Sequence, residues 1–73
     1  MNSLRDMLVK SAEADKAKAL LSLELLNGRA VGIGDHSTED FYKNAEEALA
    51  MLADADDRLD AIENYLIHKE VLL

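Results

Sequence analysis

Residues 41–66, FYKNAEEALAMLADADDRLDAIENYL, decide the fold of this 73-residue chain. Their apolar and small residues recur at alternating spacings of four and three, without a break. The residues of this seam are Phe41, Ala45, Ala48, Leu52, Ala55, Leu59, Ile62 and Leu66. A 4–3 repeat over more than three heptads is typical of a helix packed in a left-handed bundle or coiled coil. The segment therefore predicts a helix over residues 38–69, with these eight residues as its core or oligomer seam.

A second helix is predicted upstream, over residues 3–27. Helix-forming residues dominate this segment, and Asn27 followed by Gly28 is a typical helix stop. All three glycines lie between residues 28 and 34, and proline is absent, so residues 28–37 are predicted to be a loop. Ser37 with Asp40 resembles a capping box at the start of the downstream helix. We therefore predict a single all-α domain, residues 1–73, folded as an antiparallel helical hairpin.

The upstream seam is interrupted by charge at its centre. Between Ala12 and Ala19 the 4–3 spacing falls on Asp15 or Lys16. We favour the interpretation that both charged side chains point into solvent while the alanines make the contact. The alternatives are a shift of helix register and a buried ion pair that sets the register of the partner helix.

The apolar stripes of both helices are too wide for a two-helix chain to bury. Leu49, Met51, Ala53 and Tyr65 extend the downstream stripe beyond the seam, which suits a bundle better than a two-stranded coil. A second copy of the chain is the usual way to cover such stripes. The sequence therefore predicts a homodimer or higher oligomer, most simply an antiparallel four-helix bundle.

The loop and the start of the downstream helix hold the candidate ligand or partner residues. Arg29, Asp35 and His36 precede this helix, and Tyr42 lies beside the seam near its start. Helix N-termini bind anions through free N–H groups, and Arg29 adds a cation. Against a phosphate site stand the carboxylate of Asp35 and the lack of P-loop spacing. The interpretation we favour is a structural connector, and a ligand-binding loop is the alternative.

No constellation of residues supports catalysis. The chain has no cysteine, and its serines lack a neighbouring base, so no nucleophile triad can be assembled. His36 and His68 lie at opposite ends of the downstream helix, and neither stands three residues after a glutamate, as di-iron bundles require. We therefore predict no enzyme activity, no cofactor and no metal site.

The net charge of -7 belongs to the downstream helix, because acids and bases balance in the upstream one. Holding a phosphate backbone needs clustered lysine and arginine, so direct nucleic-acid binding is not expected. We interpret the acids as a solvated face, with a docking surface for a basic partner as the alternative. Charged residues interrupt every apolar stretch well before the roughly 20 residues that span a bilayer, so no membrane partner is expected.

The sequence resembles a group of short uncharacterised helical proteins of tailed phages, especially those of marine cyanobacteria. The likeness is carried by VGIGDHS at residues 31–37, ADADDRL at 53–59 and SAEADKAKALLSLELL at 11–26. It implies a small accessory protein located in the cytoplasm of an infected bacterial host. The group supplies no activity and no catalytic residue.

These observations together predict a protein that acts by binding. The first hypothesis is protein–protein interaction through a self-associating hairpin, which engages a host protein by its acidic face or its loop end. The alternative is a small-molecule or nucleotide-binding sponge, with its site at a subunit interface near the glycine-rich loop.

Overall fold

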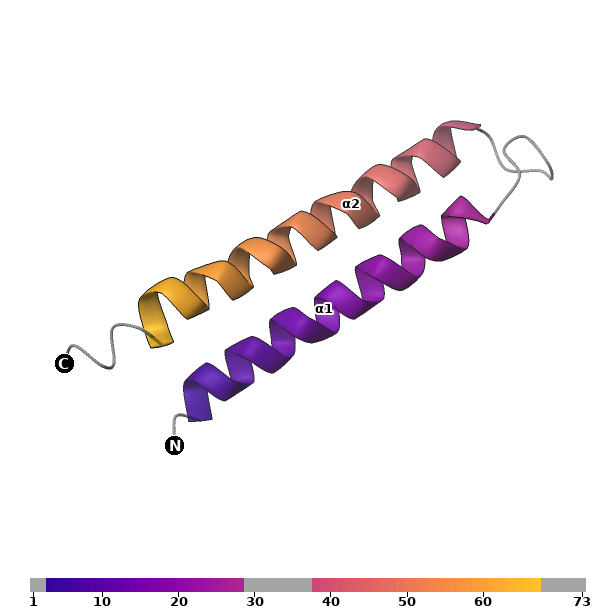
Figure 1. The fold of residues 1–73 in the computed structure, drawn as a ribbon. Coiled ribbons are helices and arrows are strands. Elements are labelled where there is room, and N and C mark those ends of the chain that lie inside the picture. Colours follow the sequence, from indigo (N-terminus) through magenta and orange to yellow (C-terminus); the bar gives the residue numbers. More distant parts are fainter. Residues whose placement is uncertain (1–2, 29–37, 68–73) are drawn as a thin grey trace.

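The computed structural model describes residues 3–28 and 38–67. Helix α1 comprises Ser3–Asn27, and helix α2 comprises Thr38–Ala61 and continues directly into a short π-helix, η1, at Ile62–Ile67. Figure 1 shows α1 and α2 side by side and antiparallel, with the start of α1 beside the end of α2. The all-α hairpin predicted from the sequence is therefore confirmed.

The ends of the helices follow local sequence chemistry. Acidic residues stand in both first turns, Asp6 in α1 and Glu39 with Asp40 in α2, where they complement the positive end of the helix dipole. At the end of α1 the N–H of Gly28 donates to the carbonyl of Glu24 at 3.2 Å, which satisfies one of the last carbonyls. The loop that follows, with the proposed cap Ser37, lies outside the described residues.

Gly28, the residue after α1, does not adopt the positive φ that glycine readily permits. Its φ lies outside the left-handed region, and a Cβ placed there would meet the carbonyl oxygens of Glu24 and Leu25 at 3.7 Å, an ordinary van der Waals distance. The predicted stop is confirmed, since α1 ends at Asn27, but the left-handed conformation that glycine usually supplies at a helix end is not used. The backbone would accept alanine.

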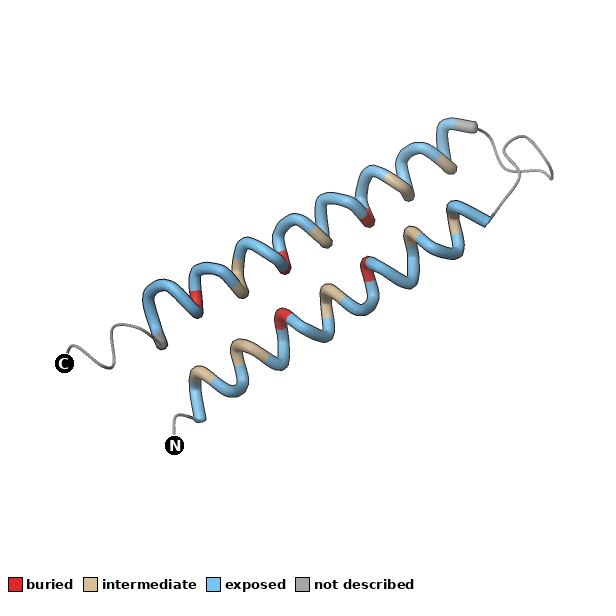
Figure 2. Tube along the Cα trace, in the orientation of Figure 1, coloured by how far each residue is buried: buried red, intermediate tan, exposed pale blue. Residues whose placement is uncertain are grey.

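The contact between the helices is built almost entirely from alanine. The buried residues among those described are Ala12, Ala19, Ala48, Ala55 and Ile62, and no large side chain there is fully buried. Within each helix these residues recur every seven positions, so they lie on one face, and Figure 2 shows the buried positions on the facing sides of the two helices. Small side chains permit a close approach, but a methyl group removes little apolar area from water. The two helices of the single chain therefore pack closely but bury little apolar area.

The predicted seam is inward-facing along α2 but not at its end. The residues from Phe41 to Leu59 on the seam are buried or half-buried, and Ile62 is buried. Leu66 is 41% exposed, so it lies outside the core of the single chain, and its place in an oligomer seam stays a prediction. It lies in η1, where i→i+5 hydrogen bonding turns side chains away from the α-helical repeat.

Candidate functional site

Tyr42 is the one proposed loop-end residue that the structure describes. Its side chain is 56% exposed, and its ring stands edge-on to that of Phe41, with centroids 5.7 Å apart and planes at 82°. Arg29, Asp35 and His36 lie outside the described residues. The structure therefore places an exposed aromatic ring near the start of α2 and does not assemble the four residues into a site.

Charged side chains bridge the two helices at the middle of the hairpin. A guanidinium nitrogen of Arg58, Nη2, donates to Asp15 Oδ2 at 2.6 Å, while its Nε donates to Asp54 Oδ2 at 3.0 Å. On the same stretch of α1, Lys16 Nζ lies 2.9 Å from Asp56 Oδ1. Two ion pairs thus cross between α1 and α2.

The favoured interpretation, that Asp15 and Lys16 both point into solvent, is therefore wrong. Both residues are half-buried, and each binds an opposite charge on α2. The reason is that their seam positions lie between the small residues Ala12 and Ala19, where long side chains from α2 have room to reach across. The pairs are not fully buried either, since the side chain of Asp15 stays 34% exposed.

The ion pairs favour the protonated forms of both bases. The hydrogen bond that Lys16 donates to Asp56, together with the charge of Asp56, raises the pKa of Lys16 above its usual range. The hydrogen bond that Arg58 donates to Asp15 raises the pKa of Arg58, and Asp54 adds to it. Because these side chains are close to solvent, each pair contributes little to the stability of the hairpin.

The carboxylates of α2 and η1, including the ion-paired Asp54 and Asp56, form a solvated exterior, which we call the acidic surface. All of its residues are exposed: Glu39, Asp40, Glu46, Glu47, Asp54, Asp56, Asp57, Asp60 and Glu63. Only Lys43 and Arg58 oppose them within residues 38–67, whereas α1 has equal numbers of acids and bases. The hairpin is therefore strongly polarised, with one neutral helix and one highly acidic helix.

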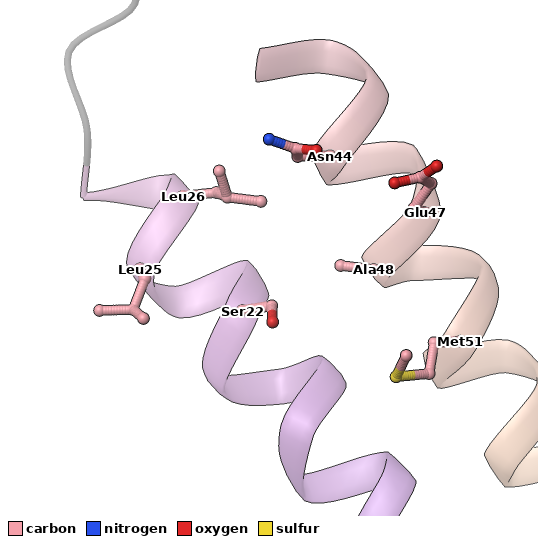
Figure 3. Close-up of a pocket in the computed structure, with 7 residues that line it drawn as sticks. All are labelled: Ser22, Leu25, Leu26, Asn44, Glu47, Ala48 and Met51. Carbon is pink, nitrogen blue, oxygen red and sulfur yellow. The ribbon is translucent and has the colours of Figure 1, made fainter. Parts of the chain in front are cut away.

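An open groove lies between the helices at the loop end of the hairpin. Its volume is about 360 Å³, and it is lined by Ser22, Leu25, Leu26, Asn44, Glu47, Ala48 and Met51. Figure 3 shows Leu26, Ala48 and Met51 pointing into the space between the helices, with Leu25 at its outer side and Glu47 at its rim. Four of the seven lining residues are apolar and three, Ser22, Asn44 and Glu47, are polar or acidic, so the groove suits an apolar side chain better than an anionic ligand.

Large apolar side chains remain exposed on both helices. They are Leu4, Met7, Leu20, Leu21, Leu25, Tyr42, Leu49, Met51, Tyr65 and Leu66. At 100° per residue, Leu4, Met7, Leu21 and Leu25 lie together on one outer side of α1, and Leu20 lies on another. The sequence analysis missed this grouping, although its signal was present as a second 3–4 spacing that starts one residue before the inner seam.

Two kinds of site find no support among the described residues. No group of three or more histidine, aspartate or glutamate side chains in residues 3–28 and 38–67 is arranged to hold a metal ion. Within the same ranges, neither helix combines the length and the apolar content needed to cross a membrane.

No known protein matches the chain, whether by protein-family description, among curated proteins or among solved structures.

Proposed function

We propose that this chain is a protein-interaction module that works as a self-associated helical hairpin. One observation carries the proposal: among residues 3–28 and 38–67, the buried residues are four alanines and one isoleucine, whereas ten large apolar side chains are exposed. A folded chain normally does the reverse, and contiguous exposed apolar surface marks interaction sites.

The second component of the proposal is a basic protein partner that binds the acidic surface. Exposed carboxylates along α2 create a one-sided negative potential, which attracts and orients a partner rich in lysine and arginine. The resemblance to short phage proteins adds the proposal that this partner is a host protein in the bacterial cytoplasm.

Sedimentation equilibrium tests the self-association directly. We expect a mass of at least twice 8.1 kDa at micromolar concentration, with the helices intact by circular dichroism. A helical monomer at all accessible concentrations would refute the proposal.

A matched pair of charge variants tests the basic partner. Glu46→Gln/Asp57→Asn/Asp60→Asn neutralises three exposed acids of α2, and Asp6→Asn/Glu13→Gln/Glu24→Gln neutralises three exposed acids of α1. We expect a stoichiometric protein from host lysate to bind the wild type and the α1 variant, and to be lost with the α2 variant. Equal retention by both variants would exclude the acidic surface.

The small-molecule alternative has one observation in its favour, the groove at the loop end. Among its seven lining residues the charged group is a carboxylate, Glu47, which repels phosphate. Purification of the wild type from host lysate discriminates between the two functions. A small-molecule sponge would co-purify with a stoichiometric nucleotide, whereas an interaction module would co-purify with a stoichiometric protein.

A further inference from the structure

Helix α1 carries a second heptad seam on its outer side, which we call the outer stripe. Its residues follow one another at spacings of 3, 4, 3, 4, 3 and 4, and all are exposed: Leu4, Met7, Ser11, Ala14, Lys18, Leu21 and Leu25. Four of the seven are large apolar residues, at the two ends of the helix, and exposed apolar residues at 3–4 spacing are the pattern of a contact with another helix. Within the chain, α2 covers the inner seam of α1 and leaves this one free.

The outer stripe has large apolar residues at both ends, and Ser11 with Lys18 is the one facing pair that differs in size. Two large apolar residues stand at each end, Leu4 with Met7 and Leu21 with Leu25, and small residues stand near the centre. A symmetric dimer requires a surface that is complementary to itself. When two such stripes run antiparallel, the facing positions are Leu4 with Leu25, Met7 with Leu21, Ser11 with Lys18, and Ala14 with Ala14.

We propose that the outer stripe binds the outer stripe of a second copy, antiparallel and around a two-fold axis at Ala14. The inference rests on the proposed self-association and specifies its surface. In this arrangement Leu4 of each copy faces Leu25 of the other copy. Leu25 lies at the outer side of the groove, so Leu4 reaches the groove of the other copy. Each copy thus completes an apolar site that is open in the single chain.

The groove fits an inserted leucine. Leu26, Ala48 and Met51 form an apolar floor, and the volume is about 360 Å³, which is room for more than one apolar side chain. Glu47 at the rim would lie beside the N-terminal end of the partner's α1, where the helix dipole favours a negative charge. The chemistry of the groove therefore matches the segment that the antiparallel register brings to it.

Lys18 is the one charged residue within the outer stripe, and the register accommodates it. It faces Ser11 of the other copy, a small residue, so its alkyl stem lies over the contact while its ammonium group reaches the edge. In the single chain this ammonium lies 3.9 Å from Asp15 Oδ1, which keeps it at the side of the helix.

Charge also favours contact through α1. This helix has four acids and four bases, so two copies meet without net repulsion. The two acidic α2 helices then stand on the outside of the dimer, apart from each other and open to solvent. Contact through α2 would instead bring two strongly negative helices together.

Single cysteines test the geometry cleanly because the chain has none of its own. Ala14→Cys places a thiol at the proposed two-fold axis, and Ala53→Cys is the matched control at an exposed position of α2. A disulfide requires Cα atoms within about 7 Å, so mild oxidation reports only on close neighbours. We expect a covalent dimer from Ala14→Cys and none from Ala53→Cys.

Charge insertion provides a second, independent measurement. Leu21→Glu lies in the outer stripe, and Leu20→Glu is its matched control, an equally large and exposed residue on another side of α1. We expect Leu21→Glu to raise the dimer dissociation constant at least about tenfold, and Leu20→Glu to leave it nearly unchanged.

The outcomes separate this inference from the proposed function. If the wild type is a dimer but Ala53→Cys crosslinks in place of Ala14→Cys, or if Leu20→Glu dissociates it and Leu21→Glu does not, the outer stripe is excluded and self-association stands. If the wild type is monomeric by sedimentation, both the inference and the proposed self-association fail.

Discussion

Replacing Ala55 with leucine tests the alanine contact on which the hairpin depends. Ala55 is fully buried against α1, so a leucine there must push the helices apart or adopt a strained rotamer. Overpacking of this kind costs about 1–3 kcal/mol. For a domain of 60–100 residues, each kcal/mol lowers the unfolding midpoint by about 4–8 °C, so we expect a decrease of roughly 5–20 °C.

Ala50→Leu is the control for this experiment. Ala50 is exposed on the same helix, and alanine and leucine have nearly equal helix propensities, so this variant should melt within about 0.5 kcal/mol of the wild type. The assay is thermal unfolding by circular dichroism at one fixed protein concentration, because self-association makes the midpoint depend on concentration. If Ala55→Leu melts with Ala50→Leu, the helices do not meet at the alanines and the described packing is refuted.

Three further predictions address the ion pairs and the end of α1. Lys16→Gln should lower the free energy of unfolding, as measured by denaturant unfolding at several pH values. The difference from the wild type should be fully present below the unfolded-state pKa of about 10.4 and should vanish as pH rises through the raised pKa of Lys16. A difference independent of pH would contradict the pairing with Asp56. The double-mutant cycle of Asp15→Asn and Arg58→Gln should give a favourable coupling that weakens between about 0.1 and 1 M salt, and a zero coupling at low salt would show that the contact contributes nothing. Gly28→Ala should raise the free energy of unfolding by about 0.4–1 kcal/mol, since it restricts the unfolded chain at a site with room for the methyl group; a loss of stability in the same assay would show that glycine is required.

The sequence by itself determined the helices and the distribution of charge. The bounds of α1 and the first residue of α2 coincide with the expected ones, because glycine, helix propensity and heptad spacing act over a few residues. Proline is absent and the glycines are confined to residues 28–34, so only one turn was possible. The contrast between the neutral α1 and the acidic α2 follows from composition alone.

Only the tertiary structure decided which of the seam residues are covered. Heptad spacing treats Ala55 and Leu66 alike, but burial depends on what stands opposite: Ala55 is fully buried, whereas Leu66 in η1 is 41% exposed. Likewise, local preference places Asp15 in solvent, whereas the space left by small residues and the reach of Arg58 from α2 bring it into the contact.

The candidate interaction surface was the least predictable part for the same reason. Leu21 and Leu25 follow a repeat as regular as that of the inner seam, and spacing alone does not say which of two repeats faces the partner helix within the chain. The structure assigns the alanine-rich seam to the intramolecular contact and leaves the outer stripe exposed. The physical reason is that periodicity is a property of one helix, whereas burial is a property of two.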